Sequence, residues 1–414
     1  MNDESQRVLW LREGLAQAGL DALVCALPMN VLLLSGYWPI VGISMALFTA
    51  DGPLMLLAPE DERELADRGR GQVRTFSPGS LNEMTSAVEA VREPLREVMR
   101  TLGLEAGRIG YEQGAAFEPV SYASMHLYGG ALPQLLQDVA PRCTLVPADD
   151  LLTRQRTVKT PEEIARIRTA CHIAEAAFEV GVQKIRPGLS ETEAAEAFCG
   201  SLSSIGVGFR DERALEHPGG LDDPGVTLSR VQRAGGFVFC MSGLNSAAAH
   251  GAYARSRCKR LAPGNLVLTH CNSYADGFWT DITRTYCLGA IDDQKRTMYE
   301  ALFEARAAAL AAIRPGALAS SVDAAARAVL TNRGFGAAFK HPTGHGVGFA
   351  AIDHNAHPRL HPRSQEVLEE GMVFNVEPGI YLDGFGGMRH CDMVAVTAGG
   401  YELLTAFQLE AMAI

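Results

Sequence analysis

Apolar positions in the first part of the chain alternate between helical spacing and short unbroken runs. Residues 7–19 carry apolar side chains on one helical face, which predicts an amphipathic helix ending at Gly19. Three apolar runs of strand length follow, at residues 22–27, 30–34 and 43–49. Two helical stretches and a strand continue the pattern, at residues 60–68, 81–102 and 108–111. Helices alternating with buried strands predict a smaller α/β domain in this region.

The same apolar runs raise the question of a membrane span. Residues 22–50 contain no charged side chain and are long enough to cross a bilayer. Pro28, Asn30, Gly36 and Pro39 interrupt the stretch, however, and divide it into pieces of strand length. We therefore expect buried strands of a soluble domain, and no membrane partner.

A strong helix signal marks the start of a second domain. Thr160, Pro161 and Glu163 form a capping box with proline at the first helical position. Apolar residues at helical spacing then line one face, at Ile164, Ile167, Cys171, Ala174 and Phe178. We place the boundary near residue 155, with an N-terminal domain over residues 1–155 and a second domain over residues 156–414.

The second domain contains an internal repeat. Residues 185–188, Ile-Arg-Pro-Gly, recur at residues 313–316, an offset of 313 − 185 = 128. Two pairs of glycines match at the same offset, Gly206 with Gly334 and Gly208 with Gly336. Each copy predicts a helix, the Ile-Arg-Pro-Gly turn, a second helix and a glycine-bounded strand. Two copies are too few for a solenoid, so they predict one domain with two pseudo-symmetric halves and a site at the seam.

The composition excludes several classes of protein. With 414 residues, 47% hydrophobic and 21% charged, the chain is globular rather than disordered or fibrous. The net charge of −11 repels phosphate backbones and anionic lipids, which argues against nucleic-acid partners. Nine scattered cysteines do not resemble a disulfide framework and favour a reducing compartment. The first residues lack the basic and apolar segments of a signal peptide, so we expect a cytoplasmic protein.

His270 and Asp281 flank an Asp-Gly turn. The apolar runs at residues 264–270 and 278–285 are separated by this turn, which predicts a β-hairpin. Such a hairpin brings His270 and Asp281 side by side on paired strands. Because an unpaired charge is costly inside an apolar strand, we expect Asp281 to have partners.

Two later segments add candidates. Residues 341–348 place His341 and His345 among glycines, which allow close backbone approach and expose the imidazoles. Glu377 ends a run that predicts a buried strand, at the start of a Pro-Gly turn.

Residues 388–396 read as a further strand. The strand period of two puts Arg389, Cys391 and Met393 on one face. The same period puts His390 and Asp392 on the opposite face.

These motifs together resemble the creatinase, aminopeptidase P and prolidase family, whose pita-bread fold is shared with methionine aminopeptidase. The resemblance covers essentially the whole chain: the N-terminal α/β region, the linking helix that begins near residues 156–164, and the 128-residue repeat. It implies an α/β (α+β) protein with a smaller N-terminal α/β domain followed by a C-terminal pita-bread domain with two pseudo-symmetric halves. It also implies a homodimer.

In the metallopeptidases of that family, two Asp, one His and two Glu side chains hold two divalent ions. The resemblance places the second Asp at Asp281, the His at His345 and the first Glu at Glu377. The first Asp lies eleven residues before the second, and 281 − 11 = 270, where this chain has His270. The last Glu falls on Cys391.

These departures change the expected metal chemistry. Only two of the four carboxylates remain, so a dinuclear manganese or cobalt site of the usual kind is not expected. Asp281, His345, Glu377 and Cys391 instead suggest a site for one divalent ion, with His270 adjacent. The thiol favours zinc or iron over manganese. A metal-free site, as in creatinase, is the open alternative.

The resemblance also assigns roles to the surrounding polar residues. His250, His341 and His354 match active-site histidines, and Arg284 and Arg389 match arginines that brace the ligands and lie beside the substrate. With Glu377 taking a proton from water, they imply a hydrolase that cleaves an amide-like C–N bond in a small molecule or short peptide, like an Xaa-Pro peptidase or creatinase. A non-catalytic pita-bread binding module and a lyase on the same scaffold are the alternatives.

Overall fold

The chain folds as two compact units, divided between Arg156 and Thr157, close to the predicted boundary near residue 155. The computed structural model describes residues 5–39, 43–77, 87–113, 131–211, 230–250, 255–353, 356–408, 410 and 412–414. Among these residues, no helix is both long and apolar enough to cross a membrane.

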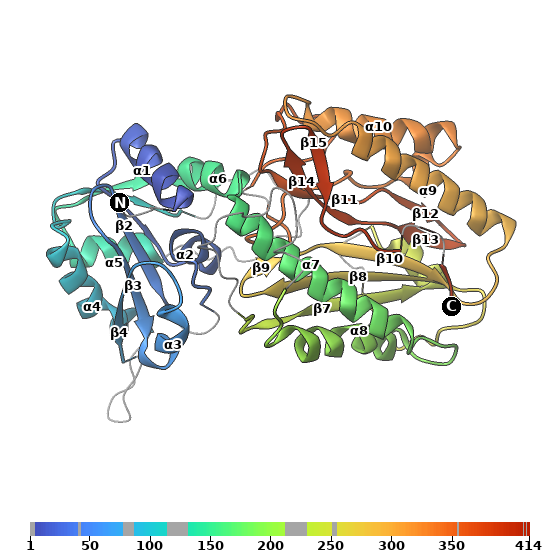
Figure 1. Cartoon of the computed structure of the whole chain (residues 1–414), viewed down its shortest axis with the longest axis horizontal. Helices are drawn as coiled ribbons and strands as arrows, with labels where there is room; N and C mark the ends of the chain where they lie inside the picture. Colours follow the sequence, from blue (N-terminus) through green and yellow to red (C-terminus); the bar gives the residue numbers. More distant parts are fainter. Residues whose placement is uncertain are drawn as a thin grey trace. The chain divides into compact units, whose positions relative to one another are not determined.

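A six-stranded sheet of order β4-β3-β2-β1-β5-β6 forms the centre of the first unit (Figure 1). β2 runs antiparallel to β1 and β3, and the other neighbours are parallel. The strands are β1 (Ala22–Cys25), β2 (Met45–Thr49), β3 (Leu54–Pro59), β4 (Gln72–Phe76), β5 (Arg108–Tyr111) and β6 (Thr144–Pro147). The helices are α1 (Gln6–Ala18), α2 (Pro28–Ser35), η1 (Glu60–Glu62), α3 (Arg63–Ala66), α4 (Ala87–Thr101), α5 (Ala131–Val139) and α6 (Asp149–Thr157).

Of the elements predicted for this unit one is wrong, and the sequence analysis did not predict β3, β4, α5, β6 or α6. α1 ends at Gly19, which adopts the left-handed conformation with φ of 61°. The predicted strand at residues 30–34 is wrong, because these residues belong to helix α2. Pro28 suits the first helical turn, and the Glu112 carboxylate accepts hydrogen bonds from the amides of Ala26 and Leu27, both at 2.6 Å. Hydrogen bonds to a residue so distant in sequence, made just before the helix begins, are not visible in a local apolar pattern. Part of the predicted helix at 81–102, residues 81–86, lies outside the described residues.

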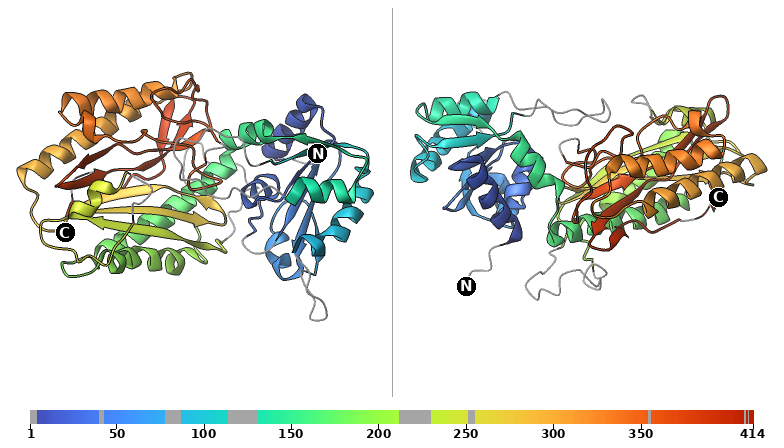
Figure 2. Two further views of the ribbon diagram at one scale, coloured as in Figure 1. Left: turned by 180° about the vertical axis from the view of Figure 1, so that it is seen from behind. Right: turned by 90° about the horizontal axis from the view of Figure 1, so that it is seen from above.

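The second unit pairs helices with sheets in two similar halves. Figure 1 shows α7 and α8 along the sheet that contains β7, β8 and β10, and Figure 2 shows α9 and α10 side by side over the other strands. The helices are α7 (Pro161–Val182), α8 (Glu191–Gly206), η3 (Gly243–Ala248), α9 (Asp293–Ala311), α10 (Ala319–Asn332) and η4 (Gly336–Ala338). The first half's strands are β7 (Ala234–Ser242), β8 (Leu266–Ala275), β9 (Phe278–Trp279) and β10 (Ile282–Cys287), joined by β16 (Met412–Ala413). The second half's strands are β11 (Val373–Val376), β12 (Gly379–Leu382), β13 (Gly386–Arg389), β14 (Asp392–Thr397) and β15 (Gly400–Leu403).

The two Ile-Arg-Pro-Gly turns confirm the predicted pseudo-symmetry of this unit. Each turn joins a longer helix to the shorter helix that follows it: α7 to α8 in the first half, and α9 to α10 in the second. Their glycines, Gly188 and Gly316, have positive φ angles of 93° and 83°. Each glycine amide donates a 2.8 Å hydrogen bond to a leucine carbonyl, Leu261 in the first half and Leu368 in the second. The helix pairs and their turns are therefore equivalent in the two halves. The glycine-bounded strand predicted for the second copy is wrong, because Gly336 begins η4 and the next described strand, β11, starts only at Val373.

Candidate metal centre and active site

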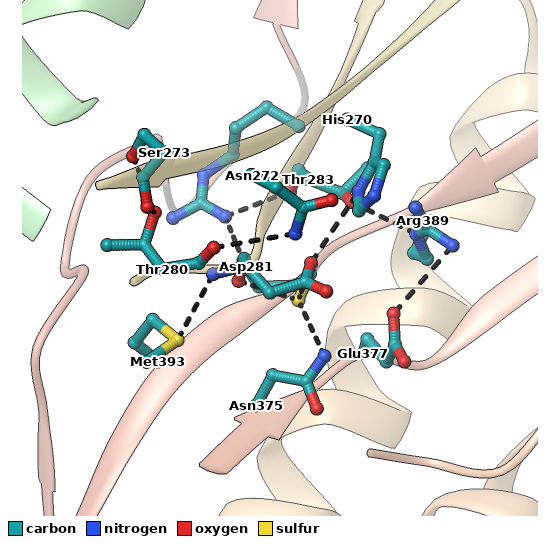
Figure 3. A network of polar contacts seen from close by, with 12 residues as sticks. His270, Asn272, Ser273, Thr280, Asp281, Thr283, Asn375, Glu377, Arg389 and Met393 are labelled. Carbon is teal, nitrogen blue, oxygen red and sulfur yellow. Dashed lines mark hydrogen bonds and ion pairs between the residues drawn. The ribbon is translucent and has the colours of Figure 1, made fainter. Parts of the chain in front are cut away.

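Asp281 lies where β9 gives way to β10, in the predicted hairpin. β8 and β10 pair antiparallel with Thr283 opposite His270, which confirms that the turn brings His270 and Asp281 together. Asp281 is only 2% exposed, and its Oδ1 lies 3.5 Å from His270 Nδ1. His270 Nδ1 also makes a 3.0 Å hydrogen bond with Thr283 Oγ1 (Figure 3).

Cys391 reaches the same place from the other half of the unit. The predicted strand over 388–396 is interrupted there, since β13 ends at Arg389 and β14 begins at Asp392. The Cys391 amide instead donates to the Thr283 carbonyl at 3.0 Å, which forms a bridge to β10. The thiol is fully buried, and its Sγ lies 3.1 Å from the Asp281 carbonyl oxygen and 3.5 Å from Asp281 Oδ1.

The predicted two faces of this segment are correct despite the interruption. Arg389 and Met393 contact the site with Cys391, because the Arg389 Nε donates to Thr283 Oγ1 and the Asp281 amide lies 3.4 Å from Met393 Sδ. On the opposite face, Asp392 binds the guanidinium of Arg284 at 2.8 Å.

His345 is held close to the strands by flanking glycines. A Cβ atom at Gly344 would lie 1.9 Å from the Asn375 carbonyl oxygen, so only glycine fits there. The His345 amide donates to Asn375 Oδ1 at 2.7 Å, and the ring Nδ1 lies 3.0 Å from the Gly346 carbonyl. Since a carbonyl only accepts, Nδ1 carries the proton and Nε2 presents a lone pair to the site.

Glu377 follows β11 and completes the cluster. Its Oε1 lies 3.8 Å from His345 Nε2, and its Oε2 lies 3.7 Å from the Arg389 guanidinium. His345 Nε2 is also 3.6 Å from Asp281 Oδ2. One ligand atom from each of Asp281, Glu377 and Cys391 falls within 4.8 Å of the other two. Residues more than a hundred positions apart in sequence thus converge at the seam of the two halves.

Comparison with known proteins shows the family to which this chain belongs. The profile of metallopeptidase family M24 matches residues 165–398, more than half of the chain. The chain belongs to metallopeptidase family M24. The creatinase/prolidase N-terminal domain matches residues 7–158.

Relatives of this M24 metallopeptidase span its full length. An Xaa-Pro dipeptidase of Pyrococcus horikoshii is 27% identical over 411 residues, covering 99% of each chain. The Xaa-Pro dipeptidase of Lactobacillus helveticus is 33% identical over 254 residues, 61% of each chain. The solved prolidase of P. horikoshii has a TM-score of 0.74 at 24% identity, with 99% of this chain and 100% of that chain covered. The solved X-Pro aminopeptidase of Thermotoga maritima has a TM-score of 0.76 at 22% identity, covering 97% of this chain and 100% of that one. Both structures have the fold predicted here.

Family membership decides between the functions that the sequence left open. M24 proteins are metallopeptidases, so the chain is a hydrolase of peptide C–N bonds, as predicted. The non-catalytic binding module and the lyase are not favoured. A bound divalent metal is consistent with the family and with the buried Asp281, Glu377 and Cys391.

Burial sets the protonation of the metallopeptidase site. Burial raises the pKa of Glu377 to about 7, although the Arg389 guanidinium opposes it. Burial also raises the pKa of the Cys391 thiol well above its ordinary value, and the Asp281 carboxylate adds to the effect. Burial acts to lower the pKa of His345, but Asp281 and Glu377 outweigh it, so this pKa is raised. Without a cation the cluster therefore retains protons that a bound metal would displace.

The distances between some donor atoms are close to those around one tetrahedral ion. With a Zn–S bond of about 2.3 Å and Zn–O and Zn–N bonds of about 2.0 Å, tetrahedral edges are about 3.5 Å for S···O and about 3.3 Å for N···O. The observed 3.5 Å from Cys391 Sγ to Asp281 Oδ1 matches the first value. His345 Nε2 lies 3.6 Å from the other Asp281 oxygen, Oδ2, and 3.8 Å from Glu377 Oε1, both longer than the second value. Among the described residues, the donors within 4.8 Å of one another are those of Asp281, Glu377 and Cys391, so these three fit a divalent ion and His345 lies outside their group.

The remaining predicted residues lie at varied distances from this cluster. His341 is half-buried and His345 is buried, so the expectation that the glycines expose the imidazoles is wrong. The His341 Nε2 binds the Tyr381 hydroxyl at 2.9 Å and its Nδ1 the Pro342 carbonyl at 2.8 Å. Burial and the Arg389 charge lower the pKa of His341 to about 3, so its ring is neutral with both nitrogens engaged. His250 is exposed, with its ring 5.2 Å from that of Tyr381. His354 lies outside the described residues.

Arg284 does not lie where a substrate-binding residue would. It is completely buried, and its guanidinium binds Asp392 at 2.8 Å and the Cys391 carbonyl at 2.7 Å. This placement supports the bracing role and leaves no surface for direct contact with a substrate. Arg389 lies against Glu377 instead and is 8% exposed.

Three site residues escaped the sequence analysis: Asn375, Tyr381 and Thr283. The Asn375 Nδ2 lies 3.5 Å from Cys391 Sγ (Figure 3). It also lies 3.2 Å from His345 Nε2, so it contacts two candidate ligands. A lone amide inside the apolar run at 373–376 was the available signal. Tyr381 and Thr283 have no such signal, because both residue types are ordinary in strands.

Proposed function

We propose that this chain cleaves the peptide bond before proline in short Xaa-Pro substrates, with one divalent metal ion at its site. The support for the substrate is the name of its relatives, Xaa-Pro dipeptidases that align over nearly all of both chains. The single observation that carries the site is the convergence of buried Asp281, Glu377 and Cys391 within 4.8 Å, with the lone pair of His345 Nε2 facing them.

Charge balance supports one ion rather than two. Asp281 and Glu377 contribute two negative charges and Arg389 one positive charge, and ionised Cys391 adds a third negative charge. The sum is −2, which one divalent ion neutralises and a second would reverse to +2. A net charge of +2 in a buried site is strongly unfavourable. We therefore propose that His270, which is neutral because burial lowers its pKa to about 4, lies beside the ion without holding a second one.

The thiol favours zinc or ferrous iron over manganese. Asn375 supports this choice, since its amide donates toward Cys391 Sγ and so stabilises a thiolate. The hydrogen bond from His345 Nδ1 to Gly346 fixes the ring in the tautomer that a metal requires.

Different side chains of the protein move protons and orient the substrate. When bound, the ion supplies Lewis acidity that polarises the scissile carbonyl and acidifies a water molecule. Glu377, which would be ionised beside the bound ion, accepts the proton of the attacking water. Burial and the Lys340 charge lower the pKa of the exposed His250, so it enters the reaction neutral and orients the substrate by hydrogen bonding. His341 holds Tyr381 in place, and we extend an active-site role to His354 from the resemblance alone.

Metal analysis and a substrate screen test this proposal together. Tag-free protein should contain about one zinc or iron per chain and hydrolyse Xaa-Pro dipeptides but not creatine. Cys391→Ser should lose metal and activity together, because a neutral hydroxyl is a weaker ligand than a thiolate. Cys258→Ser, at the exposed cysteine, is the matched control and should retain both. Two ions per chain, or undiminished metal in Cys391→Ser, would contradict the proposal.

We also propose a cytoplasmic homodimer. Free thiols at all nine cysteines support the reducing compartment, and the family resemblance supports the dimer. Light scattering on the purified protein measures the oligomeric state, and a monomer would overturn that part.

A further inference from the structure

Two buried carboxylates occupy similar places in the two halves of the second unit. Glu191 begins α8 and Asp323 lies in the first turns of α10, the helices that follow the two Ile-Arg-Pro-Gly turns. Both residues are completely buried, with 0% of their surface exposed. Neither residue is a candidate ligand, and neither contacts the cluster of Asp281, Glu377 and Cys391.

In each half, one carboxylate oxygen accepts two hydrogen bonds from a single hydroxyl residue. Glu191 Oε1 accepts from the Ser242 amide at 2.7 Å and its hydroxyl at 2.8 Å. Asp323 Oδ1 accepts from the Thr343 amide at 3.0 Å and its hydroxyl at 2.8 Å. The same pair of hydrogen bonds, from the amide and the hydroxyl of one residue to one carboxylate oxygen, therefore occurs once in each half. We call this pair the grip of the carboxylate on that residue.

The grip on Ser242 fixes the segment that leads to His250. Ser242 ends β7, and η3 and His250 follow directly. The second oxygen of Glu191 accepts from Asn245 Nδ2 at 2.7 Å and from the Arg257 amide at 2.8 Å. One carboxylate thus binds residues on both sides of His250 in the sequence. In the described chain, the partners of Glu191 are these hydrogen-bond donors alone, without an ion pair.

The grip on Thr343 fixes the segment that carries His345. Thr343 precedes His345 by two residues, and its carbonyl accepts the Glu377 amide at 2.7 Å. Asp323 is therefore one hydrogen bond away from the backbone that positions two candidate ligands. Arg327 binds both oxygens of Asp323, each at 2.9 Å, and holds the carboxylate in place.

We propose that Glu191 and Asp323 are matched positioning residues, Glu191 for His250 on the substrate side and Asp323 for His345 and Glu377 on the metal side. This inference rests on the proposed function for the roles of those three residues. Among the described residues, the groups that bind these two carboxylates are hydrogen-bond donors, so an amide substitution turns an NH₂ group toward donors. The pseudo-symmetric halves thus use one device for two separate tasks, and the tasks are separable by experiment.

The test compares Glu191→Gln with Asp323→Asn in the full-length protein. Glu191→Gln should lower kcat on an Xaa-Pro dipeptide roughly 10- to 100-fold through misplacement of His250, with an unchanged Kd for zinc. Asp323→Asn should raise the zinc Kd about 10-fold or more, measured by competition with a chromophoric chelator. Matched controls are Glu193→Gln and Asp292→Asn, at the exposed helix caps of α8 and α9. The controls should lower Tm slightly and leave both kcat and zinc Kd unchanged.

Histidine ring NMR of the metal-free protein gives a readout that needs neither substrate nor metal. The ring signals of His250 should shift in Glu191→Gln only, and those of His345 in Asp323→Asn only. If both variants lower Tm and move both sets of signals alike, or move neither, the carboxylates are merely structural and the inference is overturned. If the unmodified protein binds no zinc and cleaves no dipeptide, the proposed function fails, while the ring signals still decide the positioning roles.

Discussion

Replacing Asp392 with asparagine should destabilise the second unit by about 3 kcal/mol. Asp392 is completely buried between two arginines, with Oδ1 bound to Arg284 at 2.8 Å and Oδ2 to Arg306 at 2.5 Å. Thr405 donates to Oδ1 at 3.0 Å. The Arg284 charge and that of Arg306 lower the pKa of Asp392 against the opposing effect of burial, so the carboxylate is ionised at neutral pH.

The magnitude follows from what asparagine keeps and what it loses. Removing one partner of a buried ion pair costs about 3–5 kcal/mol, because it leaves an uncompensated buried charge. Asparagine retains an oxygen for Arg284 and Thr405 but presents an NH₂ group to Arg306, so we place the loss at the lower end. The matched control is Glu304→Gln, which removes an exposed ion pair with Arg333 and should change stability by less than about 1 kcal/mol.

Tryptophan fluorescence during urea unfolding can isolate this unit. The chain has three tryptophans, and a Trp10→Phe, Trp38→Phe background leaves Trp279 of β9 as the reporter. The Asp392→Asn midpoint should fall at constant slope. A loss below about 1 kcal/mol would refute the reasoning, since it would show that the two buried arginines do not depend on this charge.

Three further predictions concern the cluster. The double variant His270→Asp, Cys391→Glu should bind two metal ions per chain instead of one, because the added carboxylates offset the charge of a second ion. Elemental analysis measures the metal content. A content of one ion per chain would contradict the charge argument. Zinc affinity should fall as the pH falls, about tenfold per pH unit for each proton displaced. The fall should already begin above pH 7, because burial raises the pKa of the Cys391 thiol well above its ordinary value, and should steepen below about pH 7, where Glu377, with its pKa raised to about 7 by burial, must also lose its proton. An affinity that is flat in pH would contradict this. Glu377→Ala and His250→Ala should each lower kcat/KM on Xaa-Pro dipeptides by at least about 100-fold, and full activity in both would remove their proposed roles.

Much of the second unit was predictable because its signals are local. The capping boxes at Thr160 and Ser190 form with both reciprocal hydrogen bonds, and the Asp-Gly hairpin has the expected pairing. The period of two also assigned Cys391 to the side facing Asp281. These features depend on residues within a few positions of one another, so the sequence displays them directly.

The errors and omissions share a different cause. The hydrogen bonds of Glu112 just before the helix at 28–35 join residues 85 and 86 positions apart, and the grip of Glu191 on Ser242 joins residues 51 positions apart. Apolar periodicity carries no information about such contacts. The same holds for Arg284: the family resemblance implied a role at the site but not that its guanidinium pairs with Asp392.

The order of the candidate ligands along the chain has a consequence for biosynthesis. Asp281, His345, Glu377 and Cys391 are spread over 110 positions, and Cys391 is the last to be synthesised. A nascent chain still lacking Cys391 has only three of the four donors, and β10 lacks the Thr283–Cys391 bridge that sets their spacing. Metal loading is therefore a late event, after most of the protein has emerged from the ribosome.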